Sequence, residues 1–186
     1  FPYWQTDIKP QTHVTKTTIK ETAEKLAQGK IIGWYQGHGE IGPRALGNRS
    51  ILMSPEVKNG KSILNDKVKH REDYRPFAAS ILSEDVEDFF DWQGESNFMK
   101  YSIKFKDKIF EPISHIDNTS RIQTVSNDVE IFYDLINEFK KLTGLPMLLN
   151  TSLNDNGKPI AGQPSDALSL LKNSHMDSLV VGDEVF

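Results

Sequence analysis

The chain has 186 residues, which suits one domain or one domain with a short arm. Its 22 basic and 26 acidic residues give a net charge of −4, which argues against a nonspecific nucleic-acid binder, and no apolar run approaches the ~20 residues of a membrane helix. Cysteine is absent, which excludes disulfides, thiolate metal sites and cysteine nucleophiles and fits a reducing cytoplasm.

The chain begins with a polar stretch that is followed by a helical pattern. Residues 1–16 hold two prolines and show no regular apolar period, so we expect an arm or linker there and a domain over residues 17–186. In Thr17–Gln28 the apolar side chains recur on one face, and Thr17 or Thr18 can cap the start of the helix.

Helices and strands then alternate, which predicts an α/β (α+β mixed) fold in which helices pack on a mixed sheet. Short apolar runs between polar turns predict strands over residues 31–35, 51–53, 77–82, 99–105, 121–125, 146–150 and 177–181. Further helices are expected over residues 61–68, 83–90, 129–142 and 164–172. The helix expected over residues 129–142 carries a continuous apolar stripe that should face the sheet.

A stretch rich in glycine, Gly37–Ser50, separates the first two strands. Glycine lets backbone amides approach a ligand closely, and the guanidinium groups of Arg44 and Arg49 suit phosphate or carboxylate. Pro43 is well placed to begin a short helix whose N-terminus would face an anion. These residues predict an anion-binding turn, and a tight structural turn with solvated arginines is the alternative.

A second basic cluster lies further along the chain. In an extended segment, residues two apart point to the same side, so Lys69 and Arg71 could converge on one phosphate, with Arg75 beyond them. Their charge would offset the charge that develops on the oxygens in a phosphoryl-type transfer. The alternative is a solvated patch paired with Glu72 and Asp73.

A third candidate follows the apolar strand at residues 146–150. Open α/β sheets usually bind ligands at the C-terminal ends of strands, and Ser152 and Asn154 are again two residues apart. They could hydrogen-bond phosphate or ribose, and no Gly-x-Ser-x-Gly elbow marks Ser152 as a nucleophile. A simple Asx or serine turn is the alternative.

Two further observations limit the chemistry. His115 and Asp117 are too few ligands to predict a metal site, and a loop histidine held by a carboxylate is the commoner arrangement, while Arg121 either neutralises Asp117 or contacts a ligand. The P-loop and Gly-x-Gly-x-x-Gly fingerprints are absent, so any nucleotide site is of another kind. Together the three candidate stretches favour a small polyanionic ligand.

The order of these motifs resembles the C-terminal domain of the O-carbamoyltransferases, a family that includes nodulation-factor and antibiotic carbamoyltransferases. The matching stretches lie within about residues 28–182 and are residues 33–37, 40–52, 65–72, 75–78, 115–117, 121–125, 143–146 and 149–154. The resemblance implies a YrdC-like fold, a twisted mixed sheet flanked by helices. Asn118 stands where the family usually has glycine, a change that could alter the shape of the His115 loop.

The resemblance also implies an activity. In the family, this domain uses carbamoyl phosphate and ATP, with Mg²⁺ arriving on the ATP, to form carbamoyl adenylate, and an N-terminal Kae1-like domain then transfers the carbamoyl group to a substrate hydroxyl. Lys69-x-Arg71 and Ser152-x-Asn154 match the two motifs that hold the adenylate in YrdC-like proteins, which implies a catalytic role for Lys69 and Arg71. The implied substrate-binding residues are Arg44, Arg49, Ser50, Arg75, His115, Arg121, Asn150, Thr151, Ser152 and Asn154.

The sequence contains no Kae1-like domain, so we do not expect full transfer activity from this chain alone. Two alternatives remain open. The chain could be a non-catalytic nucleotide- or RNA-binding module that uses the basic residues between Lys61 and Arg75, although the net charge of −4 counts against it. It could also serve mainly to dock the Kae1-like domain.

Overall fold

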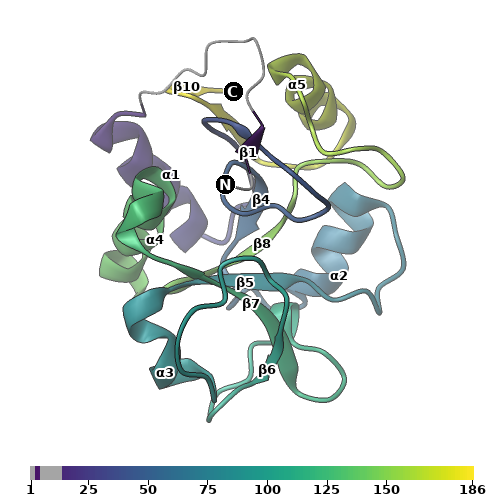
Figure 1. Cartoon of the computed structure of the whole chain (residues 1–186). Coiled ribbons are helices and arrows are strands. Elements are labelled where there is room, and N and C mark those ends of the chain that lie inside the picture. Colours follow the sequence, from purple (N-terminus) through teal and green to yellow (C-terminus); the bar gives the residue numbers. More distant parts are fainter. Residues whose placement is uncertain (1–2, 5–13) are drawn as a thin grey trace.

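The apolar runs of the sequence form one eight-stranded mixed sheet in the computed structural model, which describes residues 3–4 and 14–186 (Figure 1). In order across the sheet, the strands are β10 (Glu184–Val185), β9 (Ser178–Val181), β2 (Ile32–Tyr35), β4 (Arg49–Met53), β8 (Met147–Ser152), β5 (Ala78–Leu82), β7 (Thr119–Val125) and β6 (Ser102–Lys104). The pairs β2–β9 and β5–β7 are parallel, and the other neighbours are antiparallel. The predicted mixed sheet is confirmed.

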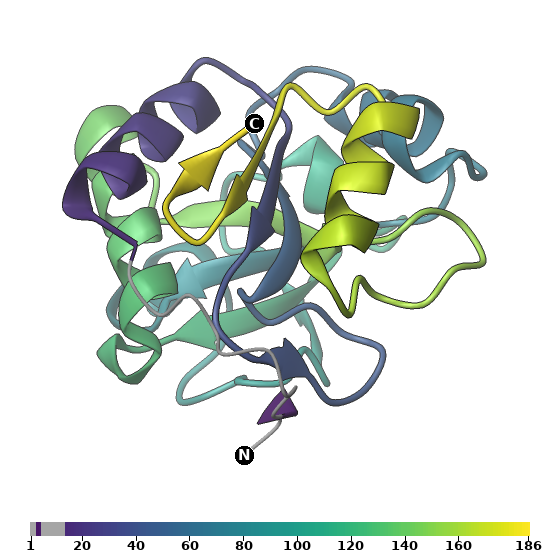
Figure 2. The ribbon, with the colours of Figure 1, turned by 90° about the horizontal axis from the view of Figure 1, so that it is seen from above.

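Helices cover both faces of this sheet. The long helices α1 (Lys16–Ala27) and α4 (Glu130–Thr143) lie side by side on one face, and α2 (Gly60–Leu64) and α5 (Pro164–Asn173) lie on the other (Figures 1 and 2). The short helix α3 (Val86–Phe89) and 3-10 turns lie in the connections, the turns over Ser83–Asp85, Glu111–Ile113 and Asn127–Val129. Because both faces are covered, the central strands are buried on both sides, as continuous apolar runs indicate.

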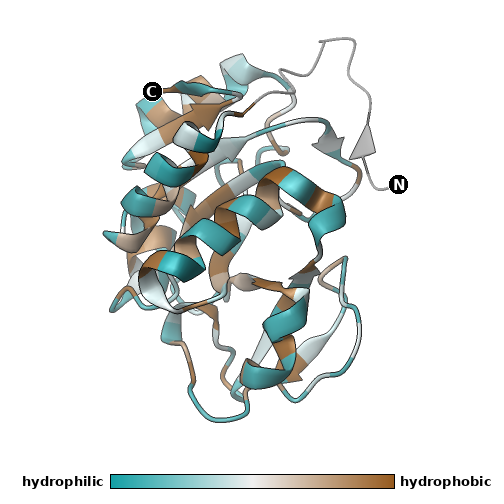
Figure 3. Cartoon of the chain, turned by 90° about the vertical axis from the view of Figure 1, so that its left-hand side faces the viewer, coloured by the Kyte–Doolittle hydropathy of each residue, from teal (hydrophilic) through white to brown (hydrophobic). Residues whose placement is uncertain are grey.

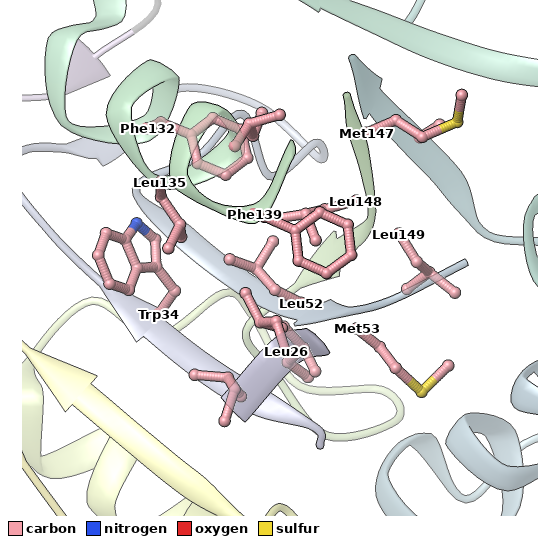
Figure 4. Packing of buried hydrophobic residues seen from close by; sticks show 14 of the residues in the cluster. Leu26, Trp34, Leu52, Met53, Phe132, Leu135, Phe139, Met147, Leu148 and Leu149 are labelled. Carbon is pink, nitrogen blue, oxygen red and sulfur yellow. The ribbon is translucent and has the colours of Figure 1, made fainter. Parts of the chain in front are cut away.

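Large side chains fill the layer between the sheet and the pair α1–α4. Trp34 of β2, Leu52 of β4 and Phe139 of α4 have no exposed surface and pack together there (Figure 4). The helices turn a hydrophilic side outward (Figure 3). Gly144 ends α4 in a left-handed conformation with φ +77°, a conformation that favours glycine.

The start of α1 differs from the expected cap. The cap is Thr15, whose hydroxyl accepts a hydrogen bond from the backbone amide of Thr18 at 3.2 Å, rather than Thr17 or Thr18. Asp183, in the turn between β9 and β10, accepts hydrogen bonds from the hydroxyls of Thr15 and Thr18 at 2.9 and 2.5 Å. The helix start is thus held by the far end of the chain.

Part of the expected arm over residues 1–16 lies outside the described residues. Within the described part, β1 (Tyr3–Trp4) pairs antiparallel with β3 (Gly39–Glu40), and Lys16 already belongs to α1. None of the helices that the structure describes is long and apolar enough to cross a membrane.

One local prediction is wrong, and two are confirmed only in part. Pro43 begins no helix, and the chain around it forms bends. The helix expected over residues 61–68 changes at Asn65 into a π-helical turn, Asn65–Lys69. The strand expected over residues 99–105 is shorter, because Met99 adopts φ +53°, which is incompatible with an extended strand.

Candidate functional site

A cavity of about 220 Å³ lies at the edge of the sheet where β8 ends and β5 begins. Five of its lining residues are basic and one is acidic, so the cavity favours an anion. The lining residues are Pro43, Arg44, Ala45, Lys69, Arg71, Arg75, Pro76, Phe77, Ala78, Met99, Arg121, Asn150, Thr151, Ser152 and Asn154–Gly157. The structure therefore brings all three predicted stretches to one place.

Lys69 is the most enclosed cation of this cavity, with 3% of its surface exposed. Its ammonium donates to the backbone oxygens of Ser152 and Asn154 at 2.6 and 2.9 Å and to Oδ1 of Asn154 at 2.8 Å. Burial, followed by the charges of Arg71 and Arg75, lowers the pKa of Lys69 to about 7, against the opposing effect of Asp155. A lysine with such a pKa is partly neutral near pH 7, and a bound anion favours its protonated, positively charged form.

Arg71 is oriented by Asn65, a wholly buried residue at the end of α2. The Nε atom of Arg71 donates to Oδ1 of Asn65 at 2.7 Å, and its guanidinium lies 4.8 Å from the centre of the Phe77 ring. Asn65 also donates to the backbone oxygen of Arg75 at 3.2 Å and so fixes the loop. Burial and the charge of Arg75 lower the pKa of Arg71 to about 10.

The route by which Lys69 and Arg71 converge is not the predicted one. Lys69 ends the π-helical turn and His70 adopts φ +45°, so the segment is a tight turn and not an extended strand. Asn65 is a residue that positions Arg71, and the site prediction missed it. The signal for it was its place one helical turn before Lys69, on the same side of the helix.

Ser152 and Asn154 form the turn that faces Lys69. The hydroxyl of Ser152 donates to Oδ1 of Asn154 at 2.6 Å, and the amide of Asn154 donates to the backbone oxygen of Lys158 at 2.6 Å. The serine turn that the sequence offered as the alternative is therefore present, and it lies in the cavity lining. Its oxygens are held in place to receive the Lys69 ammonium.

Arg121 lies in β7 at the opposite side of the cavity. Burial, together with the charge of the exposed Arg44, lowers the pKa of the Arg121 guanidinium, and its Nε atom is buried with no hydrogen-bond partner among the described residues. A guanidinium that is partly desolvated beside another cation is stabilised by a bound anion.

The glycine-rich loop does bind a carboxylate through its amides, but the carboxylate is its own. Oε1 of Glu40 accepts hydrogen bonds from the backbone amides of Leu46, Asn48 and Arg49 at 2.8, 2.8 and 3.1 Å. Glu40 therefore holds the loop that carries Arg44, a structural role that the sequence analysis missed. The sequence did contain a signal for this role, because Glu40 is a carboxylate within a glycine-rich loop whose backbone amides need acceptors.

The structure does not bring Arg49 to the cavity. Its side chain is 1% exposed, its guanidinium lies 3.5 Å from the centre of the Tyr35 ring, and it donates to the backbone oxygens of Gln36, Gly37 and Asn48. Burial lowers its pKa. Arg49 therefore stabilises the loop that carries Arg44 from inside, through its bonds to three backbone oxygens.

Ser50 and His115 also lie outside the cavity lining. The buried hydroxyl of Ser50 accepts from the amide of Gly47 at 3.2 Å. Nδ1 of His115 lies 3.0 Å from the Thr119 hydroxyl, which also donates to Asp117 at 2.7 Å, and burial and the charge of Arg121 lower the pKa of His115.

Asn118 keeps the conformation that a glycine would favour in the His115 loop. Its φ of +58° lies in the left-handed region, which asparagine tolerates better than most residues with a side chain. The change from the usual glycine therefore leaves this turn left-handed.

Replacing Glu40 with glutamine is expected to lower the free energy of unfolding by about 1–2 kcal/mol, because three amides exchange a charged acceptor for a neutral one. Urea unfolding followed by tryptophan fluorescence measures this. Glu24→Gln on the exposed side of α1 is the matched control and should change stability by less than about 0.5 kcal/mol. Equal effects of the two changes would contradict the assigned role of Glu40.

The profile of the carbamoyltransferase C-terminus family matches residues 23–186. Nodulation protein NolO of Bradyrhizobium diazoefficiens is 46% identical over 167 residues, which cover 86% of this chain and 30% of that protein. A 3'-hydroxymethylcephem-O-carbamoyltransferase of Amycolatopsis lactamdurans is 35% identical over 165 residues, which cover 88% of this chain and 32% of that enzyme. The chain thus spans less than a third of the length of these relatives.

Among solved structures, Sua5 of P. abyssi, crystallised with L-threonine, superposes with a TM-score of 0.66 over 93% of this chain and 50% of Sua5. The sequences are 13% identical, so this likeness concerns the fold. The YrdC-like sheet that the motif order implied is confirmed.

Proposed function

This chain belongs to the carbamoyltransferase C-terminus family, and from that premise we propose that its cationic cavity activates a carbamoyl group with ATP. Carbamoyl phosphate is hydrolysed to carbamate and phosphate. A carbamate oxygen then attacks the α-phosphorus of ATP, pyrophosphate leaves, and carbamoyl adenylate remains. The observation that carries the proposal is the meeting of Lys69 and Arg71 with Ser152 and Asn154 in one cavity.

The proposed chemistry needs positive charge and little covalent work from the protein, which is what this cavity offers. Lys69 and Arg71 stabilise the charge on the α-phosphate oxygens as carbamate attacks and pyrophosphate departs. Arg44, Arg75 and Arg121 bind the remaining phosphate oxygens. We propose that Mg²⁺ arrives with ATP and is held mainly by the phosphates, as in other nucleotide sites.

A second cavity supports a ligand larger than a phosphate. It measures about 300 Å³, shares Asn154 and Asp155 with the first, and includes apolar side chains such as Ile160 and Leu170. An adenylate joins an anionic end to a nucleoside, so neighbouring cationic and partly apolar cavities suit its two ends.

We further propose that a Kae1-like domain of the full-length protein receives the carbamoyl group and transfers it to a hydroxyl of the acceptor. The length of the relatives, of which this chain spans 30–32% in NolO and the cephem enzyme, leaves room for such a domain. Acceptor choice then belongs to that other domain.

Calorimetric titration of the chain with carbamoyl phosphate, and separately with a non-hydrolysable ATP analogue and Mg²⁺, tests the proposal. Binding of both ligands, weakened by Lys69→Ala, is the expected result. ATP–pyrophosphate exchange that depends on carbamoyl phosphate reports the chemical step. If neither ligand binds, and no exchange is seen with or without the full-length protein's other domain, the proposal is wrong.

Binding of a phosphate ligand is expected to take up a proton at pH 8. Free Lys69 has a pKa of about 7 and is mostly neutral at that pH, whereas an anion beside it favours the ammonium and raises its pKa. Affinity should therefore fall as pH rises above about 7, by up to roughly tenfold per pH unit. Calorimetry in buffers of different ionisation enthalpy measures the uptake, which Lys69→Met should abolish; an uptake unaffected by that change would contradict the assignment.

A further inference from the structure

A network of buried, hydrogen-bonded polar side chains lies beneath the cavity. Strand register places Asn150 of β8, Ala78 of β5 and Arg121 of β7 in one row on one face of the sheet, because each is paired with the next across the strands. Ser80 and Gln123 form the next row on the same face. Asn150, Ser80 and Gln123 are all at most 2% exposed.

These side chains are joined by hydrogen bonds that end on two adjacent carbonyls of the glycine-rich loop. Nε2 of Gln123 donates to the backbone oxygen of Leu46 at 3.0 Å, and the hydroxyl of Ser80 donates to Oε1 of Gln123 at 2.8 Å. Nδ2 of Asn150 donates to Oγ of Ser80 at 2.9 Å and to the backbone oxygen of Ala45 at 3.3 Å.

The two ends of this network decide which atoms donate and which accept along it. Backbone carbonyls only accept, so Leu46 fixes which end of the Gln123 amide carries the nitrogen, and Ala45 does the same for Asn150. The Ser80 proton is then committed to Gln123. The consequence is that Oδ1 of Asn150 makes none of these hydrogen bonds, and it is buried with no donor among the described residues.

A buried acceptor without a donor is unfavourable, and Asn150 lines the cavity. We propose that Oδ1 of Asn150 accepts an N–H of the carbamoyl amino group, which makes Asn150 the residue that selects a carbamoyl group over an acyl group of the same shape. This inference rests on the proposed function of the cavity. It assigns to Asn150 the recognition of the carbamoyl group that is transferred.

Arg121 offers the complementary group. It lies in the same row as Asn150, two strand spacings or about 10 Å away between Cα atoms, and its long side chain carries a buried Nε without a partner in the described part of the chain. A carbamoyl group has N–H donors on one side and a carbonyl acceptor on the other. An acceptor at Asn150 and a donor at Arg121 match both sides.

Two stable ligands separate this inference from simple anion binding. Phosphonoacetamide and acetonylphosphonate have the same size and the same phosphonate, and they differ only in carrying an amino or a methyl group on the carbonyl. Sites that hydrogen-bond an N–H discriminate against analogues that lack it. The chain should therefore bind phosphonoacetamide about 10- to 100-fold more tightly, as measured by calorimetry.

Variants test the origin of this preference. Asn150→Ala should reduce the ratio of the two dissociation constants to near one, mainly by weakening phosphonoacetamide. Arg71→Ala is the matched control and should weaken both ligands while leaving the ratio unchanged. Ser80→Ala removes one of the hydrogen bonds that orient Asn150, leaves the bond to the Ala45 carbonyl, and alters no cavity residue, so it should reduce the ratio partly.

The outcomes are distinct. If the chain binds both ligands equally, the role of Asn150 is wrong while the proposed function stands, because the exchange assay with carbamoyl phosphate tests that function separately. If neither ligand binds, this inference fails, and the exchange assay decides the fate of the proposed function. If Asn150→Ala does not fold, Ser80→Ala decides, and an unchanged ratio in that variant overturns the inference.

Discussion

Replacing Lys69 with alanine is expected to slow carbamoyl-phosphate-dependent ATP–pyrophosphate exchange by about 30- to 1,000-fold, which corresponds to a loss of ~2–4 kcal/mol of transition-state stabilisation. The reason is that a nearly buried ammonium stabilises developing charge more strongly than one in water. Arg71→Ala should have an effect of the same order. The measurement is the initial exchange rate at saturating ligands.

The control for this prediction lies two residues away. Lys67 is exposed on the same helical segment, so Lys67→Ala removes the same charge without touching the cavity and should leave the rate within about twofold. Arg71→Lys separates charge from geometry, because lysine keeps the charge but loses the fork that Asn65 orients. Full exchange activity in both Lys69→Ala and Arg71→Ala would contradict the catalytic role assigned to these two residues.

Replacing Gly47 with alanine is expected to lower the free energy of unfolding by about 2–5 kcal/mol. Gly47 has a φ of +107°, which a residue with a side chain rarely adopts, and an added Cβ would lie 2.2 Å from a ring carbon of Phe132. Both the backbone and the first turn of α4 would have to move. Urea unfolding measures the effect.

Two variants show whether the clash is the cause. Gly39→Ala lies in the same loop, where an added Cβ meets no atom of the described residues within 4 Å and φ is not positive, so it should cost less than about 1 kcal/mol. Phe132→Ala is costly alone, but combined with Gly47→Ala it should cost less than the sum of the two changes. Strict additivity would mean that the ring and the glycine do not conflict.

The elements with strong local patterns are the ones that the sequence predicts well. The helix predicted over residues 129–142 and its apolar stripe rest on a local signal, and both are confirmed. The order of the strands is a different matter, since β8 lies between β4 and β5 and is far from both in sequence. Pairing between distant strands depends on the packing of the whole sheet, which no short stretch encodes.

The cavity shows the same division. Residue type and spacing single out Lys69, Arg71, Ser152 and Asn154, and the structure brings them together. Type and spacing alone cannot separate Arg44 from Arg49, because both are arginines of one glycine-rich loop. The difference is burial, which sends the Arg49 guanidinium to three backbone oxygens and leaves Arg44 at the cavity.

The parallel pairing of β2 with β9 has a consequence for how the chain acquires its structure. β2 ends at Tyr35, and its outer neighbour, β9, begins at Ser178, more than 140 residues later. During synthesis, the amides and carbonyls on that side of β2 stay unpaired until Ser178–Val181 have been made and have left the ribosome. Such an open edge invites pairing with other chains, so this side of the sheet is where misassembly would begin.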